Sequence, residues 1–366
     1  MSLRDFEIIQ KLGEGAYSQV FKVKRISDSQ IYALKKVRFA PLKEKEKTNA
    51  LNEVRILASI SHPNIIGYKE AFVDESSRSL CIIMEFADGG DLLSKIRQHR
   101  DQGTRFSENE IWDILIQMVK GVKALHDMSV LHRDLKCANV FICNNGNVKI
   151  GDMNVSKVSS GELAYTQTGT PYYASPEVWR DQPYDLKSDI WSLGCVIYEA
   201  IMLIPPFRAN DMSSLYQKVT KGHYPPISKI YSAYLANTVK DLLQVNPALR
   251  PNCQQILDNP NVHRHLKGEN EDKGDPNVLL RTITLPRNFL NLANRLPAAK
   301  YRHVSAETER IPGSRYQSPG SFDAKRTITR DSDFKLPPLI RPKVQSRQPL
   351  DQKIQVLRGR IAQKVR

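Results

Sequence analysis

The sequence has few cysteines and no long apolar run, and both absences exclude classes of protein. Its five cysteines are scattered without a Cys-x-x-Cys pair, which argues against a disulfide framework or a thiolate metal site. No run of about eighteen apolar residues occurs, so no membrane-spanning helix is expected. Residue 2 is Ser2 rather than the glycine that N-myristoylation needs, and no apolar signal core follows. We therefore expect a cytoplasmic protein with reduced thiols and no membrane contact.

Acidic residues are scarce only in the last part of the chain. Residues 264–366 hold 22 Lys and Arg against 10 Asp and Glu, so +12 of the formal charge of +15 belongs to this segment and +3 to residues 1–263. A nearly neutral body makes a nucleic-acid-binding core an unfavoured interpretation, whereas the basic segment predicts contacts with acidic partners. Because the segment is rich in Pro, Ser and Arg, we expect a largely disordered tail.

Strand-like patterns come first along the chain. Residues 6–87 alternate short apolar runs with turns, and the clearest runs are at residues 20–24, 31–35 and 80–84. An amphipathic helix is predicted within this part, at residues 45–60.

Helical patterns follow, at residues 108–126 and 190–202. Strands followed by helices predict an α+β chain of two lobes. We expect a β-rich N-lobe with one main helix at about residues 6–84, a hinge at 85–90, a helical C-lobe at about 91–263, and the tail at 264–366.

A glycine-rich stretch, Gly13-Glu-Gly-Ala-Tyr-Ser-Gln-Val20, lies between two strand-like runs. Glycines at such a place let backbone N–H groups approach phosphate oxygens, although an ordinary hairpin turn would have the same composition. The stretch is not a P-loop, because no Gly-Lys-Ser/Thr follows. It is a poor dinucleotide-binding turn, because a strand rather than a helix comes next.

Lys35 lies in the following strand, at Ala33-Leu-Lys35. A lysine on a buried strand is costly unless it is paired, and Glu53 on the predicted helix is a plausible partner. The alternative is a lysine at the edge of the strand, facing water.

The stretch His132-Arg-Asp-Leu-Lys-Cys-Ala-Asn139 is more specific. One short loop supplies a carboxylate (Asp134), a cation (Lys136) and a neutral amide (Asn139), and Asp152 follows a strand-like run. One carboxylate can accept a hydroxyl proton, while the other, with the amide, can hold Mg²⁺ against phosphates. A surface loop of the same composition is the less favoured alternative.

Taken in order, these motifs resemble the signature set of eukaryotic protein kinases over residues 6–263. Ala174-Ser-Pro-Glu177, Asp189-Ile-Trp-Ser-Leu-Gly194 and Arg250 continue the pattern. Within kinases the chain resembles the NimA-related (Nek) family, through residues 51–66, 84–92, 169–177 and the flank at 279–286.

The resemblance implies a bilobal Ser/Thr protein kinase that transfers the γ-phosphoryl group of ATP to protein substrates with Mg²⁺, or alternatively Mn²⁺. It implies catalytic roles for Asp134 and Lys136, and metal binding by Asn139 and Asp152. Arg133 would pair with a phosphate on Thr166 or, second, Thr168. Glu177 and Arg250 would form a structural ion pair. Nucleotide binding falls to Leu12, Gly13, Glu14, Gly15, Ala16, Tyr17, Ser18, Gln19, Val20, Ala33, Lys35, Glu53, Met84, Glu85, Phe86, Ala87 and Asp91.

The resemblance also implies a place in cell-cycle, microtubule or ciliary regulation. We expect the cytoplasm or cytoskeleton, a centrosome, basal body or cilium, with the nucleus as an alternative. Microtubules or another acidic partner would bind the tail, although a solvated linker without a fixed partner would have the same composition.

Two positions depart from the family pattern. Ser18 stands in place of the third glycine of the loop, and Asp152-Met-Asn154 replaces Asp-Phe-Gly. The metal carboxylate is kept, so we expect catalysis to be kept and the switching of this segment to be altered. A pseudokinase or scaffold is the main competing interpretation, and the altered segment is its best support.

Overall fold

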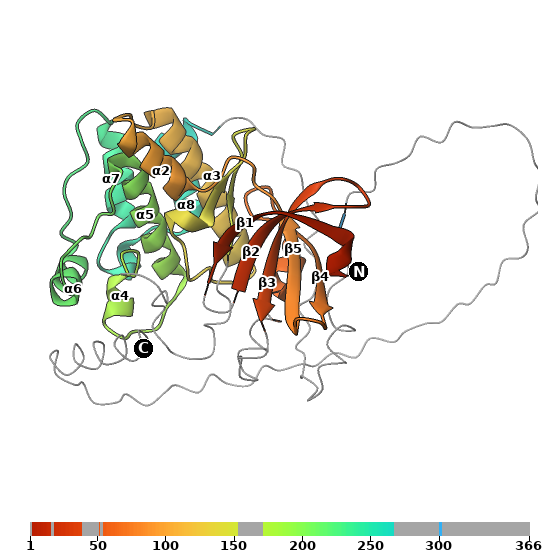
Figure 1. Ribbon diagram of the computed structural model, residues 1–366. Coiled ribbons are helices and arrows are strands. Elements are labelled where there is room, and N and C mark those ends of the chain that lie inside the picture. The colour runs from red at the N-terminus through yellow and green to blue at the C-terminus, as the bar shows by residue number, and fades with distance from the viewer. Residues whose placement is uncertain are drawn as a thin grey trace, which may run out of the picture. The chain divides into compact units, whose positions relative to one another are not determined.

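The computed structural model describes residues 2–15, 18–38, 51, 54–152, 171–266 and 300–301, all of which belong to one compact unit, residues 1–301. Strands β1–β5 form one side of this unit and the helices from α2 onward form the other (Figure 1). No helix among the described residues has the length and apolar character to cross a membrane.

The first lobe is a five-stranded antiparallel sheet in the order β1-β2-β3-β5-β4. The predicted strands at 20–24, 31–35 and 80–84 are confirmed. Its strands are β1 (Phe6–Glu14), β2 (Ser18–Arg25), β3 (Ile31–Arg38), β4 (Tyr68–Asp74) and β5 (Ser79–Glu85), after a short 3-10 turn, η1 (Leu3–Asp5). Residues 51 and 54–59 are helical, within the helix predicted over residues 45–60. Residues 45–50 and 52–53 lie outside the described part, and residue 60 is not helical.

The register of the sheet separates its two faces. Val20 lies opposite Lys35, and Ala33 lies opposite Met84, so these side chains share one face, since directly opposed residues and residues two apart project the same way. The other face holds a buried cluster, which we call the outer cluster: Phe6, Val23, Tyr32, Leu34, Phe72, Cys81 and Ile83.

The second lobe is helical. Its elements are α2 (Leu92–Asp101), α3 (Glu108–Asp127), α4 (Pro176–Trp179), α5 (Leu186–Met202), α6 (Met212–Lys221), α7 (Ala233–Leu242), α8 (Cys253–Leu257) and α9 (Pro260–His263), with the hairpin β6 (Val140–Ile142) and β7 (Val148–Ile150), and the 3-10 turns η2 (Cys137–Asn139) and η4 (Pro247–Leu249). Both long helices that the apolar pattern predicts are present. Capping boxes at Ser107 and Asp185 begin them, and α5 starts four residues before the predicted position because Asp185 caps it there.

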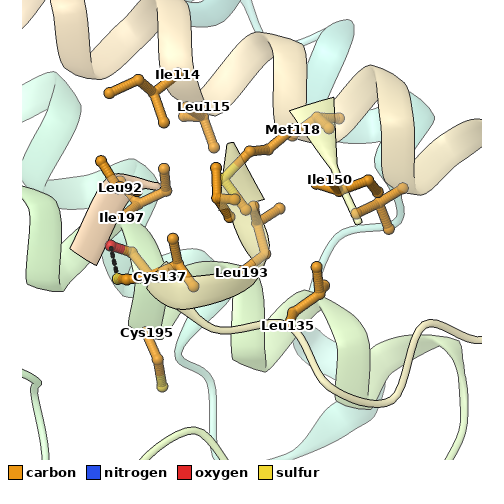
Figure 2. Packing of buried hydrophobic residues seen from close by; sticks show 14 of the residues in the cluster. Leu92, Ile114, Leu115, Met118, Leu135, Cys137, Ile150, Leu193, Cys195 and Ile197 are labelled. Atoms are coloured by element: carbon orange, nitrogen blue, oxygen red, sulfur yellow. Dashed lines mark hydrogen bonds between the residues drawn. The ribbon is translucent and has the colours of Figure 1, made fainter. Parts of the chain in front are cut away.

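The core of the second lobe lies directly under the loop that carries Asp134. Leu135 and Cys137 alternate with the polar residues of that loop and are 1% and 0% exposed. Figure 2 shows them beside Leu193 and Ile197 of α5, with Met118 of α3 nearby. The loop is therefore anchored by burial of every second side chain, which fixes where its polar side chains point.

Candidate active site

A buried carboxylate holds the backbone of the loop at His132 and Arg133. The two oxygens of Asp189 accept the N–H groups of these residues, each at 3.0 Å. His126 Nε2 lies 2.9 Å from Oδ2, and the Tyr184 hydroxyl donates to Oδ1 at 2.5 Å. Burial opposes ionisation of Asp189, but these hydrogen bonds hold its pKa below the ordinary value. Asp189 thus positions the loop as an anion, a role that the sequence analysis did not assign to it.

Three polar side chains converge at the predicted catalytic position. Lys136 Nζ lies 2.8 Å from Asp134 Oδ2, and Asn139 Nδ2 donates to the same oxygen at 3.1 Å. Asn139 Nδ2 also donates to the backbone oxygen of Asp134, at 2.8 Å. Because both bonds use the amide nitrogen of Asn139, its Oδ1 is left to accept or to ligate. The predicted grouping of these three residues is present.

His132 connects the loop to the residue that precedes Asp152. Its Nδ1 accepts the N–H of Asp134 at 3.3 Å, so its Nε2 carries the proton and donates to the Gly151 oxygen at 3.1 Å. Complete burial lowers the pKa of His132 and keeps the ring neutral. The Gly151 N–H in turn donates to the backbone oxygen of Asn139 at 3.0 Å. This bond ties the residue after β7 to η2.

Asp152 and Lys35 form an ion pair between the two lobes. Lys35 Nζ lies 2.7 Å from Asp152 Oδ1, and the ammonium group lowers the pKa of this carboxyl. Asp152 has a φ of 53°, in the left-handed region that few non-glycine residues adopt. The predicted partner Glu53, like Met153 and Asn154, lies outside the described residues.

The glycine-rich stretch ends β1 and begins β2, and β2 pairs with the strand that carries Lys35. Gly13 lies opposite Val20, which in turn lies opposite Lys35, and the Gly15 N–H donates to the Ser18 oxygen at 2.7 Å. Glu14 bonds Lys11 and Gln19, and Leu12 is 44% exposed. Ala16 and Tyr17 lie outside the described residues.

The predicted hinge is tied to both lobes through Glu85. Its backbone N–H donates to the Gly67 oxygen at 2.8 Å, and its Oε2 accepts the Gly67 N–H at 3.2 Å. Its Oε1 lies 3.1 Å from Nζ of Lys149, a buried lysine that also donates to the Pro63 oxygen at 2.7 Å. Of the neighbouring hinge residues, Ala87 is buried. The Lys22 ammonium lies 4.8 Å from the centre of the Phe86 ring.

After the hinge, the chain pairs with β6 at a place that admits only glycine. The Gly89 N–H donates to the Ile142 oxygen at 2.8 Å, and a Cβ on Gly89 would lie 2.5 Å from that oxygen. Next along the chain, Asp91 caps α2, accepting the Ser94 N–H at 2.8 Å and its hydroxyl at 2.9 Å. The nucleotide contact expected of Asp91 stays a prediction.

Replacing Gly89 by Ala is expected to raise the KM for ATP about tenfold, because the added Cβ would push the hinge away from β6. Steady-state kinetics at varied ATP would measure this. Gly103→Ala is the control for general destabilisation, since Gly103 has a φ of 66° but nothing within 4 Å of the added Cβ. Equal KM values in both variants would contradict the assigned role of Gly89.

A cavity of about 650 Å³ opens beside Asp134. Its polar wall is mostly cationic, and its apolar wall includes Leu93, Ile96, Tyr172, Val178 and Pro205. The charged side chains that line it are Arg97, Arg100, Arg133, Lys136, Arg208, Asp134 and Glu199. Glu199 accepts the Tyr173 hydroxyl at 2.5 Å, and burial raises the pKa of Glu199, which disfavours its negative charge. Cationic side chains therefore outnumber anionic ones on the described wall.

Arg133 has an unsatisfied donor in this cavity. Its Nε is buried and has no hydrogen-bond partner among the described residues, and its guanidinium lies 5.9 Å from the Tyr184 ring. A buried donor without an acceptor is costly, so the position suits an incoming anion. Thr166 and Thr168, the predicted phosphate carriers, lie outside the described residues.

The predicted pair Glu177–Arg250 is formed and buried. Arg250 Nη1 and Nη2 lie 2.7 and 2.8 Å from the two oxygens of Glu177, and the side chains are 0% and 4% exposed. The Ser188 hydroxyl donates to Glu177, and backbone oxygens of Gln244 and Lys187 accept from Arg250, both at 2.7 Å. A buried ion pair whose other donors and acceptors are also hydrogen-bonded holds the two segments that carry it in a fixed arrangement.

The donors available for a metal ion are oxygens. Asn139 lies in η2, and Asp152 is the second residue after β7. The backbone hydrogen bond from Gly151 to Asn139 joins these two segments. Two oxygen donors suit a hard divalent cation that takes its other ligands from water and phosphates. No group of three His, Cys, Asp or Glu side chains in the described part of the chain is arranged to hold a metal by itself.

Comparison with known proteins agrees with this geometry. Residues 6–262 match the family model of the protein kinase domain. The chain belongs to this family. The predicted resemblance to NimA-related kinases is also confirmed, because the chain is similar in sequence to several Nek kinases. The kinase chain is 40% identical over 252 residues to the serine/threonine-protein kinase Nek1 of Mus musculus, covering 68% of this chain and 21% of that protein.

Two further relatives extend the comparison. Nek5 of Homo sapiens is 40% identical over 258 residues, covering 70% of this chain and 36% of the relative. The probable serine/threonine-protein kinase nek2 of Dictyostelium discoideum is 39% identical over 256 residues, covering 69% and 61%. The matched part of the kinase chain thus spans from about a fifth to three fifths of the length of these relatives.

Proposed function

We propose that the chain is an active Ser/Thr protein kinase that transfers the γ-phosphoryl group of ATP to hydroxyls of protein substrates. The observation that carries the proposal is that two groups of side chains are both present: a cluster around Asp134, and an ion pair that links the two lobes. Lys136 and Asn139 both bond Asp134, and Asp152 pairs with Lys35 at 2.7 Å. A scaffold would have no need to keep both sets.

Each residue then has a chemical task. Asp134 accepts the proton of the substrate hydroxyl, and Lys136, 2.8 Å from it, steadies the transferring phosphoryl group. Lys35 binds phosphate oxygens of the nucleotide beneath Gly13 and Val20. Asn139 and Asp152 would hold Mg²⁺, with Mn²⁺ as the alternative, and the bound metal would neutralise charge on the phosphates.

The direct test is phosphoryl transfer from γ-labelled ATP, with full-length protein and both an acidic and a basic generic substrate protein. We expect label on Ser and Thr but not on Tyr, and its loss when EDTA removes the divalent cation. Stoichiometric ATP binding without label transfer would favour the pseudokinase interpretation. Because cations dominate the cavity beside Asp134, we expect the acidic substrate to be labelled faster.

The unsatisfied donor of Arg133 supports a proposal about regulation by phosphorylation. We propose that a phosphate on Thr166, or second on Thr168, accepts from Arg133 and orders the segment that follows Asp152. Thr166→Ala is expected to lower kcat/KM about 10- to 100-fold in protein activated by its own kinase activity, with Thr168→Ala less affected. Equal activity of Thr166→Ala and wild type would contradict this.

The setting in the cell is also proposed from the family. We propose a role in cell-cycle, microtubule or ciliary regulation in the cytoplasm, at the cytoskeleton, centrosome, basal body or cilium, with the nucleus as the alternative. The net +12 of residues 264–366 supports an acidic partner such as microtubules. The test is co-sedimentation of the full chain with microtubules at varied salt. We expect binding that weakens as salt rises and that is lost on truncation of residues 302–366.

A further inference from the structure

Two residues beyond the kinase domain, Lys300 and Tyr301, lie against the first lobe, and Tyr301 packs on the sheet face opposite Lys35. The Tyr301 ring packs on the outer cluster and meets the Tyr32 ring edge-to-face, with centroids 5.5 Å apart. The guanidinium carbon of Arg25 lies 3.4 Å from the Tyr301 ring centre. An aromatic ring that contacts both an arginine and a second ring gains more than the area it buries.

The Tyr301 hydroxyl explains a buried carboxylate in the sheet. It donates to Glu70 Oε2 at 2.7 Å, and Glu70 is only 7% exposed. A carboxylate buried in a strand is costly unless it receives hydrogen bonds. Burial and this hydrogen bond raise the pKa of Tyr301 well above its ordinary value, so the hydroxyl stays protonated and remains a donor.

Lys300 bonds two different elements of the lobe. Its backbone N–H donates to the Lys69 oxygen at 2.5 Å, at the register shift of β4, which is the edge strand of the sheet. Its side-chain Nζ donates to the Ala58 oxygen at 2.5 Å, at the end of the helix over residues 54–59. One residue of the tail thus bridges the sheet edge and the helix.

The contact with Ala58 completes the end of that helix. The last carbonyls of a helix lack partners within it, and a lysine there also complements the helix dipole. Here the Ile56 oxygen accepts the Ser59 hydroxyl at 2.8 Å, and the Leu57 oxygen accepts the Ile60 N–H at 3.4 Å. The next carbonyl, that of Ala58, accepts from Lys300.

We propose that Lys300 and Tyr301 form an intramolecular docking segment that holds the helix over residues 54–59 against the sheet, and that its release lowers kinase activity. The link to activity comes from Glu53, which immediately precedes residues 54–59 in the chain and is the predicted partner of Lys35. Anchoring one end of the helix restricts where its other end can lie. This second half of the proposal rests on the proposed kinase function.

The docking is tested by hydrogen exchange on the full chain. Tyr301→Ala is expected to speed exchange of backbone amides in residues 56–60 and 68–72 about tenfold, with Lys300→Met affecting 56–60 most. Tyr301→Phe, which keeps the ring and loses only the hydroxyl, should give a smaller increase. The matched controls, Tyr316→Ala and Lys343→Met, change the same residue types later in the tail. Unchanged exchange in Tyr301→Ala, or equal increases in the controls, would overturn the docking.

The coupling to activity is tested on the same proteins. Tyr301→Ala is expected to lower kcat/KM for phosphoryl transfer at least about threefold, while Tyr316→Ala keeps the wild-type value. Faster exchange in Tyr301→Ala with unchanged kcat/KM would overturn the coupling. If the wild-type protein transferred no phosphate at all, the proposed function would fail, while the exchange result would still decide whether the segment docks.

Discussion

Replacing Asp134 by Asn is expected to reduce phosphoryl transfer about 10²- to 10⁴-fold while nucleotide binding is kept. The amide preserves the size of the side chain but cannot accept the substrate proton, and general-base catalysis contributes a factor of this order. The oxygen that now accepts from both Lys136 Nζ and Asn139 Nδ2 would also lose its charge. The rates follow from kcat with saturating ATP and substrate, and ATP affinity from calorimetry on the same samples.

Asp258→Asn is the matched control for this experiment. Asp258 is an exposed carboxylate that follows α8 and accepts from Gln254, so the same chemical change there should leave kcat unaltered. A loss of less than about threefold in Asp134→Asn would contradict a role as the proton acceptor. A loss of ATP binding would instead show that Asp134 acts in the ground-state complex.

Replacing Arg250 by Met is expected to lower the free energy of unfolding by about 3–5 kcal/mol, because it leaves Glu177 buried without its counter-ion. Removal of Arg250 also leaves the Gln244 and Lys187 oxygens without their donor. Urea unfolding followed by tryptophan fluorescence would report the change, since the guanidinium lies 5.0 Å from the Trp191 ring.

Two comparisons make the Arg250 result specific. Glu177→Gln combined with Arg250→Met should recover part of the loss, because no unpaired charge is then buried. Lys123→Met breaks the Lys123–Asp127 pair, whose side chains are 30% and 61% exposed, and should cost no more than about 0.5 kcal/mol. Equal costs for the buried and the exposed pair would contradict the assigned role of Glu177–Arg250.

The grouping of the proposed catalytic residues was predictable because phosphoryl transfer demands particular side chains in a fixed order. Asp134, Lys136 and Asn139 lie within one short loop, so their proximity in sequence guarantees proximity in space. Asp152 and Lys35 are 117 positions apart, and only the resemblance to kinases placed them in one site.

Contacts between distant residues left no local pattern to interpret. Nothing near Asp189 in the sequence shows that it holds the backbone of His132 and Arg133, and nothing near Glu70 indicates Tyr301, 231 positions later. The expectation for residues 264–366 accordingly missed the contacts of Lys300 and Tyr301. The start of α5, in contrast, could have been found, since Asp185 and Ser188 have the spacing of a capping box.

A single-turnover experiment on the wild-type chain tests the central claim most directly. Enzyme in excess over γ-labelled ATP, with Mg²⁺ and saturating substrate protein, would be sampled over time beside Asp134→Asn. The arrangement of Asp134, Lys136 and Asn139 with the Lys35–Asp152 pair predicts label transfer at least about 10²-fold faster in wild type. Equal, negligible transfer by two proteins that both bind ATP would show that the chain binds nucleotide without catalysing its transfer.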